Sequence, residues 1–368
     1  MESKITEEQV LDALRQVEDP ELRKDLVSLG MIKDVRVEGD RVDFTIELTT
    51  PACPLKNVMQ KDCEEALARV GVKRVNIRWG SRVRKTTAHA AGKGATIVLE
   101  GVKNVVLVGS GKGGVGKSTV AANLALALAR DGAKVALLDA DLYGPSIPMM
   151  FGTYERPVTT DEKHVDPIHA HGIDLMSIGF FVAPEQAMIW RGPILSGTIL
   201  QFLRDVNWGE QDYLIVDLPP GTGDVQLSIA QNLRVTGAVM VTTPQELSLA
   251  DVGRAKGMFD QVKVPVLGLV ENMSYFVCPN CGTRHDIFAT GGGKVAAERL
   301  HVPFLGSIPL DMGVSLSGDS GVPTVAREPD SEVAQAFIAI ARNLAGKISM
   351  QAMEDGGGRR PLFAKEFD

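Results

Sequence analysis

The sequence predicts an α/β protein in which a mostly parallel, doubly wound sheet follows a small N-terminal α/β domain. Two observations lead to this fold class. From residue 103 onward, short apolar runs typical of buried parallel strands alternate with longer segments of helical periodicity. A glycine-rich stretch at residues 109–119 separates the apolar run 105–108 from the Ala- and Leu-rich segment 118–130, so a strand turns into a helix there. Such alternation predicts helices on both faces of the sheet.

The main domain is predicted to cover residues 104–348, followed by a flexible tail at residues 349–368. Its predicted strands are residues 105–108, 134–138, 173–178, 213–216, 238–242, 266–270 and 304–308. Its predicted helices are residues 118–130, 194–206, 225–233, 247–262, 292–300 and 331–344.

Residues 1–80 are predicted to form a separate small α/β domain. Its predicted elements are a helix at 6–17, strands at 32–37 and 42–48 joined by a turn at 38–40, a helix at 55–70 and a strand at 72–79. Residues 81–103 are rich in small and basic residues and lack periodicity, which favours a flexible linker.

The composition limits the classes of function. The chain has 368 residues and a formal net charge of −7 without a long basic run, which argues against a nucleic-acid groove. It has no apolar stretch of membrane-spanning length, and its first residues resemble neither a secretory signal nor a transit peptide. We therefore expect a cytoplasmic protein without a nucleic-acid or membrane partner. In a reducing compartment, four cysteines indicate metal or redox ligands rather than disulfides.

The glycine-rich stretch carries the strongest motif. Residues 111–118 read G-x-x-x-x-G-K-S, the Walker A pattern. The alternative is a glycine-rich strand-to-helix turn that binds no ligand. In this pattern backbone N–H groups surround phosphate oxygens, Lys117 faces the β- and γ-phosphates, and Ser118 ligates Mg²⁺. The predicted ATP-binding residues here are Gly111, Lys112, Gly113, Gly114, Val115, Gly116, Lys117, Ser118 and Thr119. The Walker A pattern therefore predicts that the parallel sheet is that of a P-loop NTPase.

Polar residues at strand ends are expected to meet the phosphates, because ligands of parallel sheets gather at the carboxyl ends of the strands. Asp217 closes the apolar strand 213–216, as in a Walker B segment, and is predicted to hold Mg²⁺. Asp139 and Asp141 follow another strand and alternate in direction; one of them is alternatively a helix N-cap. Asn272 ends a strand with an amide able to read an adenine edge, or is a turn residue.

The second sharp motif is Cys278-Pro-Asn-Cys281-Gly. A C-x-x-C pair supplies half of a tetrahedral zinc site or half of the thiolates of a cubane iron–sulfur cluster. A second copy of the chain would supply an identical pair across a two-fold axis. The alternatives are a zinc site completed by His285, a redox dithiol and a structural hairpin. Cys63 is interpreted as a core residue, whereas Cys53, just before a helix, is either reactive or packed.

The additional lysine, Lys112, resembles the deviant Walker A motif of the MinD/ParA/nitrogenase iron protein class. The resemblance implies an ATPase that forms an ATP-dependent homodimer, in which Lys112 reaches nucleotide in the partner subunit. It also implies catalytic roles for Lys112, Lys117 and Asp141, the last positioning the attacking water. Asp139 is implied near the metal, and Asn272 and Pro309 against the base.

Most of the chain resembles the bacterial Mrp/ApbC family of iron–sulfur cluster carriers. The matching segments are residues 110–119, 139–148, 190–193, 217–224 and 271–274, the last leading to Cys278 and Cys281. The small domain is similar to one found in iron–sulfur assembly factors, whose cysteine occupies a Pro-flanked loop like that of Cys53.

The resemblance implies ATP, Mg²⁺ and a 4Fe-4S cluster bridged by Cys278 and Cys281 of two protomers. Cluster donors and apo iron–sulfur proteins are the implied partners, with ATP hydrolysis coupled to loading or release. Trp190 and Arg191 are expected in the subunit interface or in an apolar platform for clients, and Trp190 is alternatively a core residue. The alternative functions are a ParA/MinD-like positioning ATPase and a zinc-stabilised regulatory ATPase.

Overall fold

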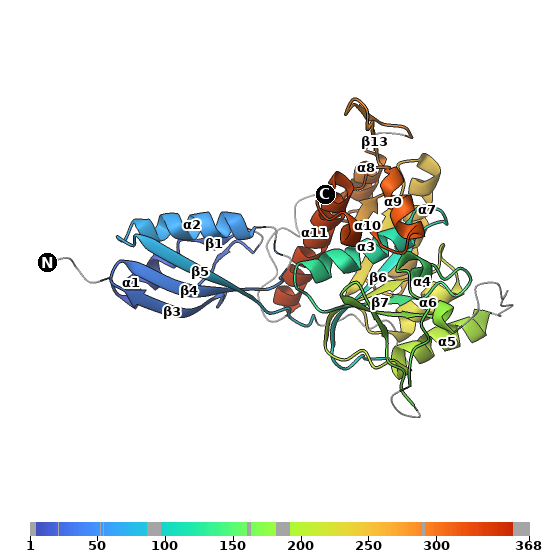
Figure 1. The fold of residues 1–368 in the computed structure, drawn as a ribbon, viewed down its shortest axis with the longest axis horizontal. Helices are drawn as coiled ribbons and strands as arrows, with labels where there is room; N and C mark the ends of the chain where they lie inside the picture. The colour runs from blue at the N-terminus through green and yellow to red at the C-terminus, as the bar shows by residue number, and fades with distance from the viewer. Residues whose placement is uncertain are drawn as a thin grey trace. The chain divides into compact units, whose positions relative to one another are not determined.

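A computed structural model of the chain describes residues 5–20, 22–51, 53, 55–86, 97–159, 163–181, 192–288 and 291–355 (Figure 1). For residues 192–195 and 355 it describes the backbone alone. The chain divides into two compact units, one made of Met1–Arg84 with Ala345–Asp368 and the other of Lys85–Leu344. Across the described ranges, no helix combines the length and the apolar character needed to cross a membrane.

The larger unit is built on an eight-stranded sheet of order β15-β12-β11-β6-β10-β7-β9-β8. Its strands are β6 (Val102–Ser110), β7 (Val135–Asp139), β8 (Ile168–Ala170), β9 (Ile173–Ser177), β10 (Gln211–Asp217), β11 (Gly237–Thr242), β12 (Val266–Glu271) and β15 (Phe304–Ser307). All neighbours pair in parallel except β8, which lies antiparallel to β9. The predicted mostly parallel sheet is therefore confirmed, and β8 is a strand that the sequence analysis missed.

Helices pack along this sheet, as Figure 1 shows for α3 beside β6 and β7. The helices are α3 (Lys117–Arg130), α4 (Ile147–Met150), α5 (Gly192–Asp205), α6 (Asp224–Asn232), α7 (Glu246–Gln261), α8 (Gly292–Arg299), α9 (Met312–Asp319), α10 (Thr324–Arg327) and α11 (Glu332–Asp355), with a 3-10 turn at Ile178–Phe180. Small side chains allow α3 to approach the sheet closely, and every residue from Val120 to Leu128 is buried.

Three parts of this unit differ from the prediction. Helix α9 has glycine and serine between its apolar residues, so no apolar stripe indicates a helix there. Helix α11 begins in this unit and continues past the predicted end at residue 344 to Asp355, among residues grouped with the small unit. Residues 349–355, expected in a flexible tail, are therefore helical. Within the predicted linker, Thr86 is buried and donates a hydrogen bond to Asn104 Oδ1 (3.1 Å), and β6 begins already at Val102.

The small unit contains a three-stranded sheet of order β3-β4-β5. Its elements are α1 (Glu7–Leu14), β1 (Glu18–Asp19), β2 (Lys24–Asp25), β3 (Ile32–Glu38), β4 (Arg41–Leu48), α2 (Lys56–Ala68) and β5 (Arg74–Ser81). The regular alternation of exposed and buried residues in β4 places one face of the sheet in the core. Cys63 on α2 is fully buried in that core, as interpreted, and Cys53 is half-buried against it.

Candidate functional site

The glycine-rich loop connects strand β6 to helix α3, as predicted. Gly114 and Gly116 adopt left-handed backbone conformations with φ of 78° and 80°. A Cβ atom at Gly116 would lie within 3.0 Å of Asn272 Nδ2, and one at Gly111 equally close to the backbone of Asp251. Glycine is therefore required at Gly116 by both conformation and space.

Lys117 is the charged centre of the loop. Its ammonium group donates hydrogen bonds to Asp217 Oδ1 (2.6 Å) and Ser118 Oγ (3.2 Å), and both Lys117 and Asp217 are buried. The second carboxylate oxygen, Asp217 Oδ2, is buried without a hydrogen-bond partner in the described part of the chain. A buried acceptor of this kind is usually satisfied by an ordered water or an ion. Asp217 and Ser118 therefore supply the oxygen donors that suit Mg²⁺.

Asp139 lies opposite Asp217 in the pairing of β7 with β10. Its carboxylate accepts hydrogen bonds from the Asp141 N–H (3.1 Å), the Ile147 N–H (3.2 Å) and Ser177 Oγ (3.0 Å). Burial, reinforced by the charge of Asp217, raises the pKa of Asp139 to about 7. Asp139 thus organises the loop after β7, and its predicted place beside the metal stays a prediction.

Asp141 borders a cavity of about 520 Å³ together with Pro219, Pro220 and Asp224. Burial raises the pKa of Asp141, while the charge of Lys117 opposes this shift. The Asp141 carboxylate therefore lies within electrostatic reach of Lys117. The resemblance implies that Asp141 positions the attacking water. Its role stays a prediction.

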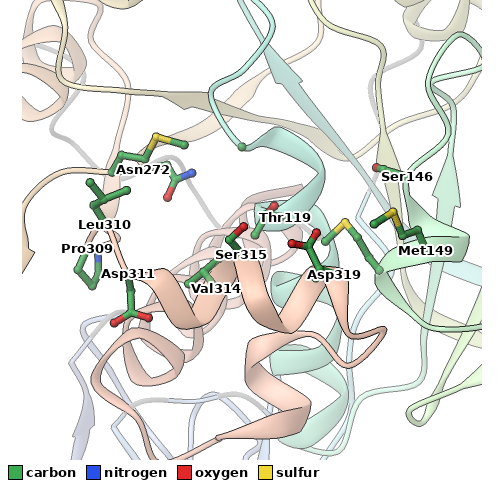
Figure 2. Close-up of a pocket in the computed structure, with 14 residues that line it drawn as sticks. Thr119, Ser146, Met149, Asn272, Pro309, Leu310, Asp311, Val314, Ser315 and Asp319 are labelled. Atoms are coloured by element: carbon green, nitrogen blue, oxygen red, sulfur yellow. The ribbon is translucent and has the colours of Figure 1, made fainter.

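Asn272 and Pro309 line one pocket of about 360 Å³ that Gly116 and Thr119 also border (Figure 2). Asn272 donates from Nδ2 to the Val115 carbonyl oxygen in the glycine-rich loop (2.9 Å). Figure 2 shows further lining residues that the sequence analysis missed: Ser146, Met149, Leu310, Asp311, Val314, Ser315 and Asp319. Several of them belong to helices α4 and α9, neither of which the sequence pattern predicted.

Cys278 and Cys281 lie between two short antiparallel strands, β13 (Phe276–Val277) and β14 (Arg284–His285). Figure 1 shows this hairpin projecting from the larger unit. The Gly282 N–H closes the turn on the Cys278 carbonyl oxygen (2.8 Å), with Gly282 at φ 69°. Cys281 is exposed and Cys278 is half-buried. Both thiols are therefore carried on one exposed turn.

Two neighbours shape the chemistry of the hairpin. The Cys281 sulfur lies 3.2 Å from Thr283 Oγ1, and this hydrogen bond, with further ones from the Thr283 backbone and Cys278, lowers the pKa of the Cys281 thiol. The Arg284 guanidinium lies 3.8 Å from the ring centroid of Tyr275. The lowered pKa of Cys281 thus arises within its own turn, whereas Arg284 is held by the ring of Tyr275.

A zinc site completed by His285 does not form within one copy as far as the structure describes it. His285 is exposed and pairs with Phe276 in the hairpin ladder. No group of three or more His, Cys, Asp or Glu side chains is arranged for a metal ion among the described residues. Trp190 and Arg191 lie outside those residues. Within one copy, the two thiols therefore have no third metal ligand among the described residues.

We expect the thiols to differ strongly in reactivity. Burial raises the pKa of Cys63 to about 12, so at about pH 8 roughly one molecule in ten thousand carries its thiolate, which is the reactive form. Cys281 is exposed and its pKa is lowered. Iodoacetamide should therefore modify Cys281 quickly and Cys63 only after unfolding in urea, as peptide mass spectrometry would show. Comparable rates in the native protein would contradict this assignment.

The strand order, the glycine-rich loop and the Lys117–Asp217 pair at the strand ends define a P-loop NTPase. The profile of a family described as "NUBPL iron-transfer P-loop NTPase" matches residues 101–345. A second profile, "Iron-sulfur cluster assembly protein", matches residues 7–79. The chain therefore belongs to the family of iron-transfer P-loop NTPases, which confirms the resemblance noted on the motifs.

Individual relatives agree with this assignment. A protein of Deinococcus radiodurans named "Iron-sulfur cluster carrier protein" is 53% identical over 356 residues, covering 96% of this chain and 99% of that protein. A protein of the same name from Escherichia coli K12 is 42% identical over 351 residues, covering 94% and 92%. A solved nucleotide-binding protein of Archaeoglobus fulgidus, in complex with ADP, is 41% identical with a TM-score of 0.57, covering 65% of this chain and 93% of that one.

Proposed function

We propose that this protein is an ATP-dependent carrier that binds a 4Fe-4S cluster between two copies of the chain and transfers it to apo-proteins. The observation that carries the proposal is the exposed turn with Cys278 and Cys281, on the same unit as the P-loop. Relatives that cover most of the chain bear the name of iron–sulfur cluster carriers. Exposure of the thiols suits a cargo that has to enter and leave.

The number of ligands supports a homodimer. A cubane cluster takes four thiolates, and one turn supplies Cys278 and Cys281. A second copy related by a two-fold axis adds the same pair, so the cluster is shared at the interface. The extra lysine, Lys112, supports the same assembly, because in the deviant Walker class that it resembles this lysine contacts nucleotide in the partner subunit.

The nucleotide site supports ATP hydrolysis as the driving reaction. Lys117 exchanges Asp217 for the β- and γ-phosphate oxygens when ATP binds, since both partners compete for one ammonium group. Ser118 and Asp217 would hold Mg²⁺, which neutralises charge on the phosphates. Asp141 orients the attacking water and Lys112 stabilises the transferred phosphoryl group. Asn272 and Pro309 contact the base. Hydrolysis then changes the subunit interface and couples to loading or release.

Anaerobic reconstitution with iron and sulfide tests the proposal. The protein is expected to take up about four iron and four sulfide per two chains, with the absorption of a cubane cluster, and to pass the cluster to an apo acceptor. Cys278→Ala and Cys281→Ala should lose the cluster, because each removes two of the four thiolates of the dimer.

His285→Ala is the matched control, since it changes the same exposed hairpin without removing a thiol. It should retain the cluster. Uptake of zinc alone, or cluster transfer by the cysteine variants, would refute the carrier function. Uptake of zinc alone would favour the zinc-stabilised regulatory ATPase, and a protein that binds neither metal nor cluster would favour the positioning ATPase.

A further inference from the structure

A short segment, residues 272–277, connects the nucleotide pocket directly to the cysteine hairpin. It begins at Asn272, which lines the pocket and donates a hydrogen bond to the Val115 carbonyl oxygen of the P-loop (2.9 Å). It ends in strand β13, immediately before Cys278. The nucleotide pocket and the thiols are therefore separated along the chain by this connecting segment alone.

The connecting segment is bonded to the wall of the pocket. Backbone hydrogen bonds hold it at three points: the Asn272 N–H to Thr242 O (2.8 Å), the Ser274 N–H to Ile308 O (2.9 Å) and the Leu310 N–H to Tyr275 O (2.6 Å). Pro309 and Leu310, on the bonded neighbour, line the same pocket as Asn272 (Figure 2). A displacement of Pro309 and Leu310 would therefore reach the connecting segment through its backbone hydrogen bonds.

Glu271 anchors the start of the connecting segment. It is the last residue of strand β12, and its side chain is buried. The carboxylate accepts one hydrogen bond from Ser274 Oγ (2.5 Å) and another from the Gly293 N–H in the first turn of helix α8. A Cβ atom at Gly293 would lie 2.7 Å from Glu271 Oε2, so glycine permits this approach.

The hydrogen bond from the Gly293 N–H alone would make Glu271 a cap for helix α8, since a carboxylate stabilises a helix N-terminus. The hydrogen bond from Ser274 Oγ does not cap the helix, because Ser274 belongs to the connecting segment. Hydrogen bonds to a buried carboxylate are among the stronger ones in proteins. Together they fix the turn after β12 to both the sheet and α8.

We propose that Glu271 and Ser274 are positioning residues that make the connecting segment stiff, so that filling the nucleotide pocket repositions the hairpin that carries Cys278 and Cys281. A nucleotide displaces Asn272 and the Pro309–Leu310 wall. Because the Glu271–Ser274 bond prevents the turn from absorbing this displacement, it reaches strand β13. The inference rests on the nucleotide site proposed above and is independent of cluster binding.

Alkylation of the hairpin cysteines in the metal-free, full-length protein measures the effect. Iodoacetamide rates at Cys278 and Cys281 are followed by peptide mass spectrometry, with and without Mg²⁺ and a non-hydrolysable ATP analogue. In the unchanged protein the analogue should change these rates about fivefold or more, the lower range of coupling between sites. Cys53, in the other unit, serves as the reference thiol.

Ser274→Ala and Glu271→Gln should reduce this change to less than about twofold, because each weakens the anchor. The affinity of Ser274→Ala for the analogue should be unchanged, since Ser274 does not line the pocket. Ser248→Ala is the matched control: its hydroxyl is also buried and lies 2.6 Å from Thr243 Oγ1, in the neighbouring turn after β11. It should behave like the unchanged protein.

The inference is overturned if the analogue leaves the alkylation rates of the unchanged protein the same, or if Ser274→Ala retains the full change. It is also overturned if Ser274→Ala loses the change together with an altered sedimentation profile, because association would then set the exposure of the hairpin. Should Glu271→Gln fail to fold, Ser274→Ala alone decides. A protein that loads clusters without nucleotide-dependent alkylation refutes the coupling, whereas one that shows the coupling but binds only zinc refutes the carrier function.

Discussion

Replacing Lys117 with alanine is expected to lower ATP turnover at least about a hundredfold, the usual effect of removing one group that stabilises transition-state charge. Lys117 is buried at the start of α3, and its ammonium group lies between Ser118 and Asp217. Lys112 does not replace this charge within one copy, because the proposed role of Lys112 is to contact nucleotide in the partner subunit. Phosphate release under saturating ATP is the measurement. Lys294→Ala, an exposed lysine on α8, should leave turnover unchanged.

The same substitution leaves Asp217 buried without its cation, and breaking such a pair costs about 3–5 kcal/mol of folding free energy. Loss of activity must therefore be separated from loss of structure. In Lys117→Met/Asp217→Asn both charges are removed, so stability should recover relative to Lys117→Ala while turnover stays absent. Thermal unfolding without nucleotide measures the first effect. Recovery of turnover in the double variant would contradict the role assigned to Lys117.

The parts of the fold that the sequence predicted are those specified by local patterns. Apolar runs predicted the parallel strands, and the spacing of Gly111, Lys117 and Ser118 predicted the strand-to-helix loop. Helix α9 was not predicted because Gly313 and Gly318 interrupt its apolar pattern. Its residues nevertheless line the pocket that contains Asn272. A helix of this kind is stabilised by its tertiary neighbours rather than by its own periodicity.

Contacts between distant residues could not be predicted from the sequence. Lys117 and Asp217 meet because β6 and β10 are neighbours in the sheet, which the order of the strands decides. The sequence analysis made no assignment for Glu271, and only the approach of α8 shows that its side chain is buried. Asp139 was predicted from its place after a strand, but two of the three hydrogen bonds to its carboxylate come from Ile147 and Ser177, which are distant in sequence.

Gly116→Ala is expected to destabilise the protein and to weaken nucleotide binding at least about tenfold. The left-handed conformation of Gly116 costs an alanine about 1–2 kcal/mol. The new Cβ also displaces the Asn272 amide, which loses its hydrogen bond to Val115 at a further cost of about 1 kcal/mol. Because Asn272 lines the pocket, its displacement also disturbs the surface that a base would contact. Thermal unfolding and titration with ADP measure the two effects.

Gly114→Ala separates these causes, because Gly114 has nearly the same φ but open space around its Cβ position. It should show the conformational cost alone, with a smaller decrease in melting temperature than Gly116→Ala. If the collision with Asn272 makes the difference, Asn272→Ala should destabilise the unchanged protein but stabilise the Gly116→Ala variant. This reversal of sign is specific to a steric conflict between the two residues, since independent sites would give additive effects. Additive losses in the double variant would show that Asn272 does not restrict residue 116.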